Sequence, residues 1–274
     1  MNTIGVQIFY NKTTDIEAKF REAVEMGITS CQLCIWDESM YSDEYVKIIK
    51  DALDKTGFKI TTLWAGWAGP CEWNFSYGPS TIGLVPQAYR FARLNTLKKA
   101  SDFAKELGVD KIATHVGFIP ENPDNPDFVG TVGALRQLCG YIKNNGQYFL
   151  FETGQETPVT LLRTIQAIGT DNVGINFDTA NLILYGKGNS LDALDVIGSY
   201  VMDTHIKDGV YPKDGMSLGK EVVAGSGKAN LPAVVKKLLE LGYTGAFTIE
   251  REIHGEEQRR DIAKTRELLI QWMQ

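Results

Sequence analysis

Eight short runs of β-forming residues alternate with longer amphipathic helical runs along this chain of 274 residues. Such alternation is typical of parallel strands joined by helical crossovers. No linker rich in proline, glycine or serine divides the sequence, so one closed (β/α)₈ TIM barrel, a single domain over residues 1–274, is favoured over two doubly wound domains. The expected strands are residues 3–9, 28–35, 59–65, 109–115, 147–152, 172–178, 201–206 and 245–250.

Several helical runs end close to a glycine, which adopts without strain the left-handed conformation that often follows a helix. The longest irregular segments are residues 65–87 and 207–230, which follow the third and seventh strands. Loops in those places build the active sites of (β/α)₈ barrels. The clearest helical runs are residues 16–27, 45–57, 94–108, 132–146 and 231–245, and the glycines interpreted as structural are Gly27, Gly57, Gly108, Gly146 and Gly242.

The charge and hydropathy of the chain limit its partners. The formal net charge is -6 at pH 7, which argues against nucleic acid, because sequence-independent affinity for it requires clustered lysine and arginine. The first ten residues lack the features of a secretory signal, and no apolar stretch is long enough to span a membrane. We therefore expect a cytoplasmic protein that does not enter membranes, and the sequence leaves a homo-oligomer open.

The four cysteines are interpreted as free thiols. Cys31 and Cys34 form a Cys-x-x-Cys pair, but they fall in an expected strand, where side chains three apart point to opposite faces and cannot share a metal ion. Cys71 and Cys139 supply no second pair. Buried free thiols in a reducing compartment are the ordinary outcome.

Four successive strands of the expected barrel end in residues that bind metals. Because the carboxyl end of each strand faces the catalytic mouth, their side chains are expected to converge there. Three carboxylates and one imidazole suit a divalent ion, and we expect one per chain, with Mn²⁺ favoured over Mg²⁺, Co²⁺ or Zn²⁺. The four candidate ligands are Glu152, Asp178, His205 and Glu250.

Each of these residues also has an ordinary structural explanation. Acidic residues at strand ends often cap the next helix, and a single histidine in a strand is often a hydrogen-bonded core residue. The metal site is favoured because ligand types occupy four successive strand ends together.

The sequence around these positions contains the motifs THVGFIPE, FETGQET, NFDTANLILYG, THIKDG and GYTGAFTIERE. These motifs resemble the xylose isomerase-like TIM barrel superfamily of sugar and sugar-phosphate isomerases and epimerases, which includes D-tagatose 3-epimerase-like enzymes. The resemblance covers nearly the whole chain. It implies that Glu152, Asp178, His205 and Glu250 hold the metal shared by that superfamily, and that the two glutamates double as acid and base.

Two departures from related patterns bear on function. Many epimerases have Asp-x-x-His at the sixth strand, with the histidine touching substrate, whereas here the fourth residue of that motif is Asn181. Among the related apurinic-site endonucleases, His115 matches a fourth-strand ligand, but the third strand here ends in Leu63 and Trp64 without a histidine. The loop after His205 also lacks their Asp-x-His. A trinuclear DNA-repair site therefore cannot be assembled.

Lys207, His115 and Glu156 are further candidates for substrate binding, together with Asn181. Lys207 shares the strand face of His205 and could neutralise a forming enolate, or it could form an ion pair with Asp208 or another acid. His115 could orient the substrate or pack in the barrel mouth. Glu156 could contact a sugar hydroxyl or cap a helix.

Three tryptophans and one glycine-rich segment complete the set of candidates. Trp36, Trp64 and Trp67 could pack against the apolar face of a sugar ring, although core packing explains any one of them equally well. The segment AGSGKANLP lies where barrels often bind phosphate through backbone N–H groups. Turn-forming glycines and a helix cap explain that segment without a ligand.

These residues point to chemistry on a small sugar substrate. A metal ion beside a ketose carbonyl would stabilise the enediolate formed on deprotonation of the adjacent carbon, a step common to epimerisation, aldose–ketose isomerisation and dehydration. The leading hypothesis is a metal-dependent isomerase or epimerase of a sugar or sugar phosphate, with Glu152 and Glu250 as the acid–base pair. The alternatives are a keto-sugar dehydratase or lyase of the inosose or 3-keto-glycoside type, and a sugar-binding barrel without catalysis.

Overall fold

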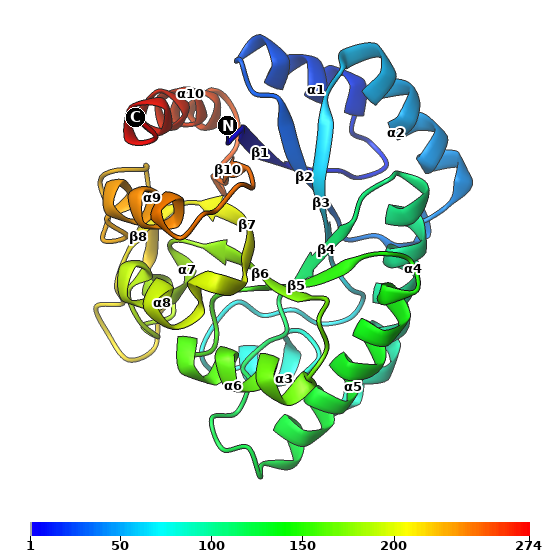
Figure 1. Cartoon of the computed structure of the whole chain (residues 1–274), viewed down its shortest axis with the longest axis vertical. Coiled ribbons are helices and arrows are strands. Elements are labelled where there is room, and N and C mark those ends of the chain that lie inside the picture. Colours follow the sequence, from blue (N-terminus) through cyan, green and yellow to red (C-terminus); the bar gives the residue numbers. More distant parts are fainter. Residues whose placement is uncertain (1) are drawn as a thin grey trace.

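The computed structural model describes residues 2–274, and its central feature is a closed barrel of eight parallel strands (Figure 1). The order around the ring is β1-β10-β7-β6-β5-β4-β3-β2, and pairing of β1 with β10 closes it. The alternating pattern in the sequence therefore predicted the fold class correctly. The barrel strands are β1 (Ile4–Phe9), β2 (Ser30–Ile35), β3 (Lys59–Ala65), β4 (Lys111–Thr114), β5 (Tyr148–Glu152), β6 (Val173–Asp178), β7 (Val201–Ile206) and β10 (Phe247–Ile249).

A longer helix follows each barrel strand, and Figure 1 shows these helices around the outside of the ring. None of the helices between residues 2 and 274 combines the length and the hydropathy that crossing a membrane requires. The helices that cover the barrel are α1 (Ile16–Glu25), α2 (Asp43–Thr56), α4 (Gln87–Glu106), α5 (Pro126–Lys143), α6 (Pro158–Ile168), α8 (Ser190–Ile197), α9 (Leu231–Glu240) and α10 (Glu256–Trp272).

Burial on both faces of the strands holds this arrangement together. Every residue of β2 and of β6 is buried, as expected for parallel strands with helices outside and facing strands inside. The helices bury only one face: in α1 the buried residues are Ile16, Phe20 and Ala23, at helical spacing. Burying a large apolar side chain such as Phe20 stabilises the fold by roughly 1.5–3 kcal/mol.

The helix ends agree with the glycine pattern, but two helices start more than one turn earlier than expected. All five glycines interpreted as structural adopt positive φ, between 67° and 82°. The helix expected from residue 94 begins at Gln87, and the one expected from residue 132 begins at Pro126. In α5 the Asn125 side chain accepts the N–H of Asp127 at 2.8 Å, and Pro126 suits the first helical position. These first turns carry little apolar periodicity, so the pattern missed them.

The two segments expected to be irregular reach the barrel mouth but contain short regular elements. Residues 65–87 include the helix α3 (Gly78–Thr81). Residues 207–230 include the antiparallel pair β8 (Asp208–Val210) and β9 (Lys220–Val222). Elements this short are too brief for hydrophobic periodicity to reveal. The other short elements are α7 (Asn181–Leu184) and the 3₁₀ turns Glu38–Met40 and Gly198–Tyr200.

The buried carboxylate of Asp208 organises the second of these segments. Its Oδ1 accepts the N–H of Gly209 at 2.9 Å and of Ala229 at 3.0 Å. Its Oδ2 accepts the N–H of Gly225 at 3.0 Å and of Gly227 at 2.8 Å. The glycine-rich segment that could have bound phosphate therefore surrounds a carboxylate of the chain itself. We refer to these four N–H groups and Asp208 as the Asp208 nest.

The cysteines are free, as expected from their spacing. Cys31, Cys34 and Cys139 are buried, and Cys71 is partly exposed. Cys31 and Cys34 belong to different apolar clusters, which agrees with their placement on opposite faces of β2.

Replacement of Asp208 should destabilise the fold far more than replacement of an exposed turn aspartate. We expect Asp208→Ala to lower the free energy of unfolding by about 3 kcal/mol, because four backbone N–H groups lose a buried charged acceptor. Asp214→Ala is the matched control, since its exposed carboxylate accepts the N–H groups of Met216 and Ser217. Its effect should be about 0.5 kcal/mol or less. Urea denaturation in buffer without phosphate or sulfate measures both, and equal effects would contradict the role of the nest.

Candidate metal centre

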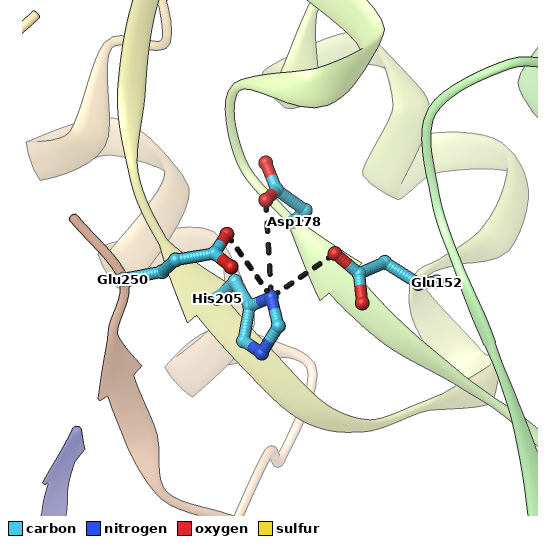
Figure 2. A group of neighbouring side chains, drawn as sticks. All are labelled: Glu152, Asp178, His205 and Glu250. Atoms are coloured by element: carbon cyan, nitrogen blue, oxygen red, sulfur yellow. Dashed lines mark hydrogen bonds and ion pairs between the residues drawn. The ribbon is translucent and has the colours of Figure 1, made fainter. Parts of the chain in front are cut away.

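Four buried side chains meet at the mouth of the barrel, as the sequence predicted. Glu152 ends β5, Asp178 ends β6, His205 lies in β7 and Glu250 directly follows β10. Each offers one ligand atom, and these atoms all lie within 4.8 Å of one another. The strands therefore bring together residues that are almost a hundred positions apart in the sequence (Figure 2).

His205 stands at the centre of this cluster. Its Nδ1 lies 3.1 Å from Glu152 Oε1, 3.3 Å from Glu250 Oε2 and 3.9 Å from Asp178 Oδ2. Figure 2 shows the two glutamates approaching this nitrogen from opposite sides, with Asp178 between them. One imidazole nitrogen thus faces three carboxylates.

The other nitrogen of His205 is held by a buried amide relay inside the barrel. His205 Nε2 lies 2.8 Å from Gln32 Oε1, and the Gln32 amide nitrogen donates to Asn176 Oδ1 at 2.8 Å. With its proton on Nε2, His205 donates to Gln32 and turns the lone pair of Nδ1 toward the carboxylates, as a metal ligand requires. Gln32 therefore favours this tautomer and orients the ring, and the Asn176 amide nitrogen lies 3.3 Å from the same Nε2.

Glu152 has one oxygen engaged and one turned toward the cluster. The indole N–H of Trp64 donates to Glu152 Oε2, and the amide nitrogen of Asn176 lies 3.4 Å from the same atom. Oε1 is left facing His205, with His115 Nε2 at 3.4 Å and Asn181 Nδ2 at 3.4 Å. The carboxylate is therefore oriented from behind by residues of β3 and β6.

The buried charges of the cluster shift one another's pKa values. Burial lowers the pKa of His205, but Glu250 and Glu152 outweigh it and raise that pKa well above its ordinary value. Burial raises the pKa of Glu250, but Lys207 and His205 outweigh it and hold that pKa well below the usual range. The pKa of Glu152 is also lowered, with burial opposed by His205 and His115. For Asp178 burial prevails and raises the pKa.

The two glutamates, whose pKa values are lowered, thus face His205 and Lys207, whose pKa values are raised. Metal ligands bind in their deprotonated forms, so a divalent ion at this cluster would compete with protons for the same atoms. Asp178 also has an oxygen to offer: Oδ1 accepts the N–H groups of Ala180 at 2.7 Å and Asn181 at 2.8 Å, whereas buried Oδ2 has no hydrogen-bond partner. Capping of α7 thus uses one oxygen and leaves the other for an ion.

A cavity of about 490 Å³ opens above the cluster. Glu152 and Glu250 line it, whereas Asp178 and His205 do not. Sequence candidates that also line this cavity are His115, Asn181, Lys207, Trp36 and Trp64.

Lys207 occupies the side of the cavity formed by β7 and the end of β10. Its Nζ lies 3.0 Å from Glu250 Oε2 and 3.1 Å from Glu252 Oε1. It also lies 3.4 Å from Asn181 Oδ1. The alternative pairing with Asp208 does not occur, because that carboxylate lies in the Asp208 nest. Lys207 instead pairs with other acids while facing the cavity.

His115 and Glu156 lie in different surroundings. Burial lowers the pKa of His115, and its Nδ1 has no hydrogen-bond partner, so a neutral imidazole is available at the cavity wall. Glu156 is buried, and burial raises its pKa to about 8. It is not among the residues that line the cavity within the described part of the chain.

Several residues of the site were not singled out from the sequence. Gln32 and Asn176 interrupt otherwise apolar strands, and Asn176 shares a strand face with Asp178, so period-two patterning could have flagged both. Trp73, Glu221 and Glu252 line the cavity from outside the barrel strands. Trp73 and Glu252 lie outside helices and strands, and Glu221 lies in the three-residue strand β9, so no periodicity marks these positions.

The chain has relatives of the same architecture. Residues 20–272 match the family model described as xylose isomerase-like TIM barrel. A xylose isomerase domain protein from Planctomyces limnophilus is 31% identical, and the structures agree with a TM-score of 0.91 over 98% of this chain and 97% of that one. A 3-keto-D-glucoside 4-epimerase from E. coli has 17% identity and a TM-score of 0.72 over 99% of this chain and 100% of that one, which shows a common fold.

A further relative in sequence is an uncharacterised protein from Methanocaldococcus jannaschii. It is 25% identical over 191 residues, which make up 65% of this chain and 61% of that protein. The match therefore spans about 61% of the length of that relative.

Loss of the Gln32 contact should weaken metal binding. We expect the wild-type chain to bind close to one divalent ion, and Gln32→Leu to bind Mn²⁺ about 10- to 100-fold more weakly, because His205 loses the acceptor that fixes its tautomer. Gln137→Leu, at an exposed position of α5, is the control and should bind as the wild type does. Calorimetric titration with elemental analysis gives affinity and stoichiometry. An unchanged Mn²⁺ affinity in Gln32→Leu would show that Gln32 does not prepare His205 for metal binding.

Proposed function

The chain belongs to the xylose isomerase-like TIM barrel family, and from this premise we propose that it is a metal-dependent isomerase or epimerase acting on a ketose. Glu152, Asp178, His205 and Glu250 would hold one divalent ion, with Mn²⁺ the favoured species. When bound there, the ion would polarise a substrate carbonyl and stabilise negative charge on its oxygen.

One observation carries the proposal. Of the four cluster residues, the two glutamates line the cavity, and Figure 2 shows them on opposite sides of His205. A substrate above the cluster would therefore lie between two carboxylates. Glu152 and Glu250 are the proposed acid and base: one removes a proton from the carbon next to the carbonyl, and the other returns a proton to the opposite face. Asp178 and His205 mainly hold the ion.

The residues around the glutamates have supporting roles in this proposal. Lys207 brings a fixed positive charge to within 3.0 Å of Glu250 and stabilises the negative charge that develops on deprotonation. Asn181 lies between Glu152 and Lys207 and contacts a substrate hydroxyl with its amide, in the place where many epimerases have a histidine. His115 offers an unpartnered nitrogen to a hydroxyl group.

A second reaction class begins with the same proton transfer. In a keto-sugar dehydratase or lyase, the carbanion next to the carbonyl would expel water or an alcohol instead of being reprotonated. The cavity volume of about 490 Å³ supports elimination as a second candidate reaction, because it leaves room beside the cluster for a leaving group. Product mass separates the two classes, since isomerisation and epimerisation conserve mass and elimination does not.

Deuterium incorporation tests the proposed proton transfer. Mn²⁺-loaded protein incubated in D₂O with a panel of ketoses, ketose phosphates, inososes and 3-keto-glycosides should place deuterium on the carbon next to the carbonyl of its substrate. Glu152→Gln and Glu250→Gln should each lower turnover by about 10²- to 10⁴-fold, because each removes one of the two proton-transfer groups. Mass spectrometry and NMR of recovered sugars measure both results.

Metal content must be measured in the same variants, because each glutamate is also a proposed ligand. Glu257→Gln, at an exposed position of α10, is the control for a lost carboxylate and should keep full activity. Turnover with intact metal and no deuterium in substrate or product would reject proton abstraction and indicate a hydride shift between neighbouring carbons.

Replacement of Lys207 should affect the transition state more than substrate binding. We expect Lys207→Met to lower kcat by about 10²-fold and to change KM much less, because the charge that Lys207 stabilises develops during the reaction. Lys236→Met removes an exposed lysine of α9 and should leave both constants unchanged. Steady-state kinetics on the substrate found by deuterium exchange gives the comparison. A large rise in KM at constant kcat would make Lys207 a substrate-binding residue only.

A further inference from the structure

Aromatic rings form one wall of the cavity from the metal centre to its outer edge. Trp64 donates its indole N–H to Glu152, and its ring centroid lies 5.3 Å from that of Trp36. Trp36 meets the ring of Trp73 edge-on at 6.4 Å. Trp73 is 41% exposed although it lines the cavity, as does Phe9, which is 45% exposed. Large aromatic surfaces left open at a cavity are typical of binding sites.

The backbone beside this wall is shaped to hold it. A Cβ atom at Gly66 would lie 2.4 Å from the Trp36 ring, so the absence of a side chain lets the indole lie directly against the chain. Trp73 comes from the loop between β3 and α3, and its ring also lies 5.1 Å from that of His115. The outer rings are therefore placed by both the barrel and a mouth segment.

The cavity is larger than one sugar ring requires. At roughly 30 Å³ for each water molecule of liquid, 490 Å³ would hold about sixteen waters. A free hexose has fewer non-hydrogen atoms than that, and bonded atoms pack more closely than separate waters. Space beside the aromatic wall therefore remains when one sugar ring lies at the metal centre.

The charges of the cavity oppose an anionic substrate. Within the described residues, Lys207 is the one lysine or arginine that lines it, and Glu250 and Glu252 already pair with its Nζ. Two further carboxylates, those of Glu152 and Glu221, face the same space. The Asp208 nest, where a phosphate group could have found backbone donors, holds the chain's own carboxylate. A phosphate group beside these carboxylates would meet repulsion, and the lysine that lines the cavity is already paired with two of them.

We propose that the substrate is an uncharged sugar that keeps a ketone carbonyl and is joined to a second ring, as in the aryl glycoside of a keto sugar or a disaccharide. The reacting sugar lies at Glu152 and Glu250, and the second ring packs against Trp73 and Trp36. This inference rests on the proposed function, since it takes the metal centre as the place where the sugar reacts. It adds a specificity-determining surface that the chemistry at the metal does not require.

Equilibrium binding of unreactive glycosides tests the second ring separately from the reaction. Mn²⁺-loaded protein is titrated calorimetrically with methyl and phenyl glycosides of glucose, galactose and xylose, and with glucose and galactose and their 6-phosphates. We expect a phenyl glycoside to bind about tenfold more tightly than the methyl glycoside of the same sugar. A 6-phosphate should bind more weakly than its free sugar.

Two variants locate the preference. Trp73→Ala should bring the phenyl-to-methyl affinity ratio close to one, and Gly66→Ala, which displaces the Trp36 ring, should reduce it. Phe91→Ala removes an aromatic ring that is 75% exposed on α4 and should keep the wild-type ratio. Melting temperatures establish that each variant is folded.

The outcomes distinguish this inference from the proposed reaction. The second-ring inference is overturned by any one of three results. These are equal affinity for the phenyl and methyl glycosides of every sugar, no saturable binding of any phenyl glycoside, and tighter binding of a 6-phosphate than of its free sugar. A Trp73→Ala variant that keeps the preference overturns the place assigned to that ring. The protein could also prefer phenyl glycosides through Trp73 and yet show no deuterium exchange. That result would support the proposed substrate class and reject the proposed proton transfer.

Discussion

Repulsion among three buried carboxylates is the constraint on which the rest of the barrel mouth depends. Two unit charges about 4 Å apart interact by about 4 kcal/mol at an effective dielectric constant of about 20. That is a large share of the roughly 5–15 kcal/mol by which a domain is stable. The chain offsets it with His205 among the carboxylates and Lys207 beside Glu250. Because the balance depends on short distances, each charge lies on a barrel strand or directly after one, and buried amides orient the imidazole from inside the barrel.

The structure separates the support of the metal centre from the surface that contacts a substrate. The four proposed ligands and the two amides behind His205, those of Gln32 and Asn176, lie on barrel strands or directly after one. Neighbouring strands fix their positions there. Trp73 and Glu221 lie in the mouth segments instead, and these segments are held by their own contacts, such as the Asp208 nest. A change in a mouth segment can therefore alter which molecules enter while the charge balance at the centre is kept. This separation is a general property of (β/α)₈ barrels, whose loops vary on a constant core.

The sequence predicted those features that depend on local periodicity or on the position of a strand end. The eight strands, the helix-ending glycines and the convergence of Glu152, Asp178, His205 and Glu250 follow from such patterns. Contacts across the barrel could not be predicted in this way, since Gln32 and His205 meet only when the ring closes. The same holds for Asp208, whose position next to Lys207 suggested an ion pair, while three of its four partners lie about twenty residues further along the chain. Glu156 illustrates the opposite case, because spacing from Glu152 alone did not place it at the cavity.

The contact between Trp64 and Glu152 has a consequence for how this protein can be observed. An indole whose N–H donates to a carboxylate senses the electric field of that group directly, and its fluorescence responds to that field. An ion that draws electron density from Glu152 would change the emission of Trp64 without any added label. Trp36 and Trp73, farther along the same wall, would respond instead to a molecule that excludes water from their faces. The barrel mouth thus contains its own optical probes, one beside the charged centre and others toward the solvent.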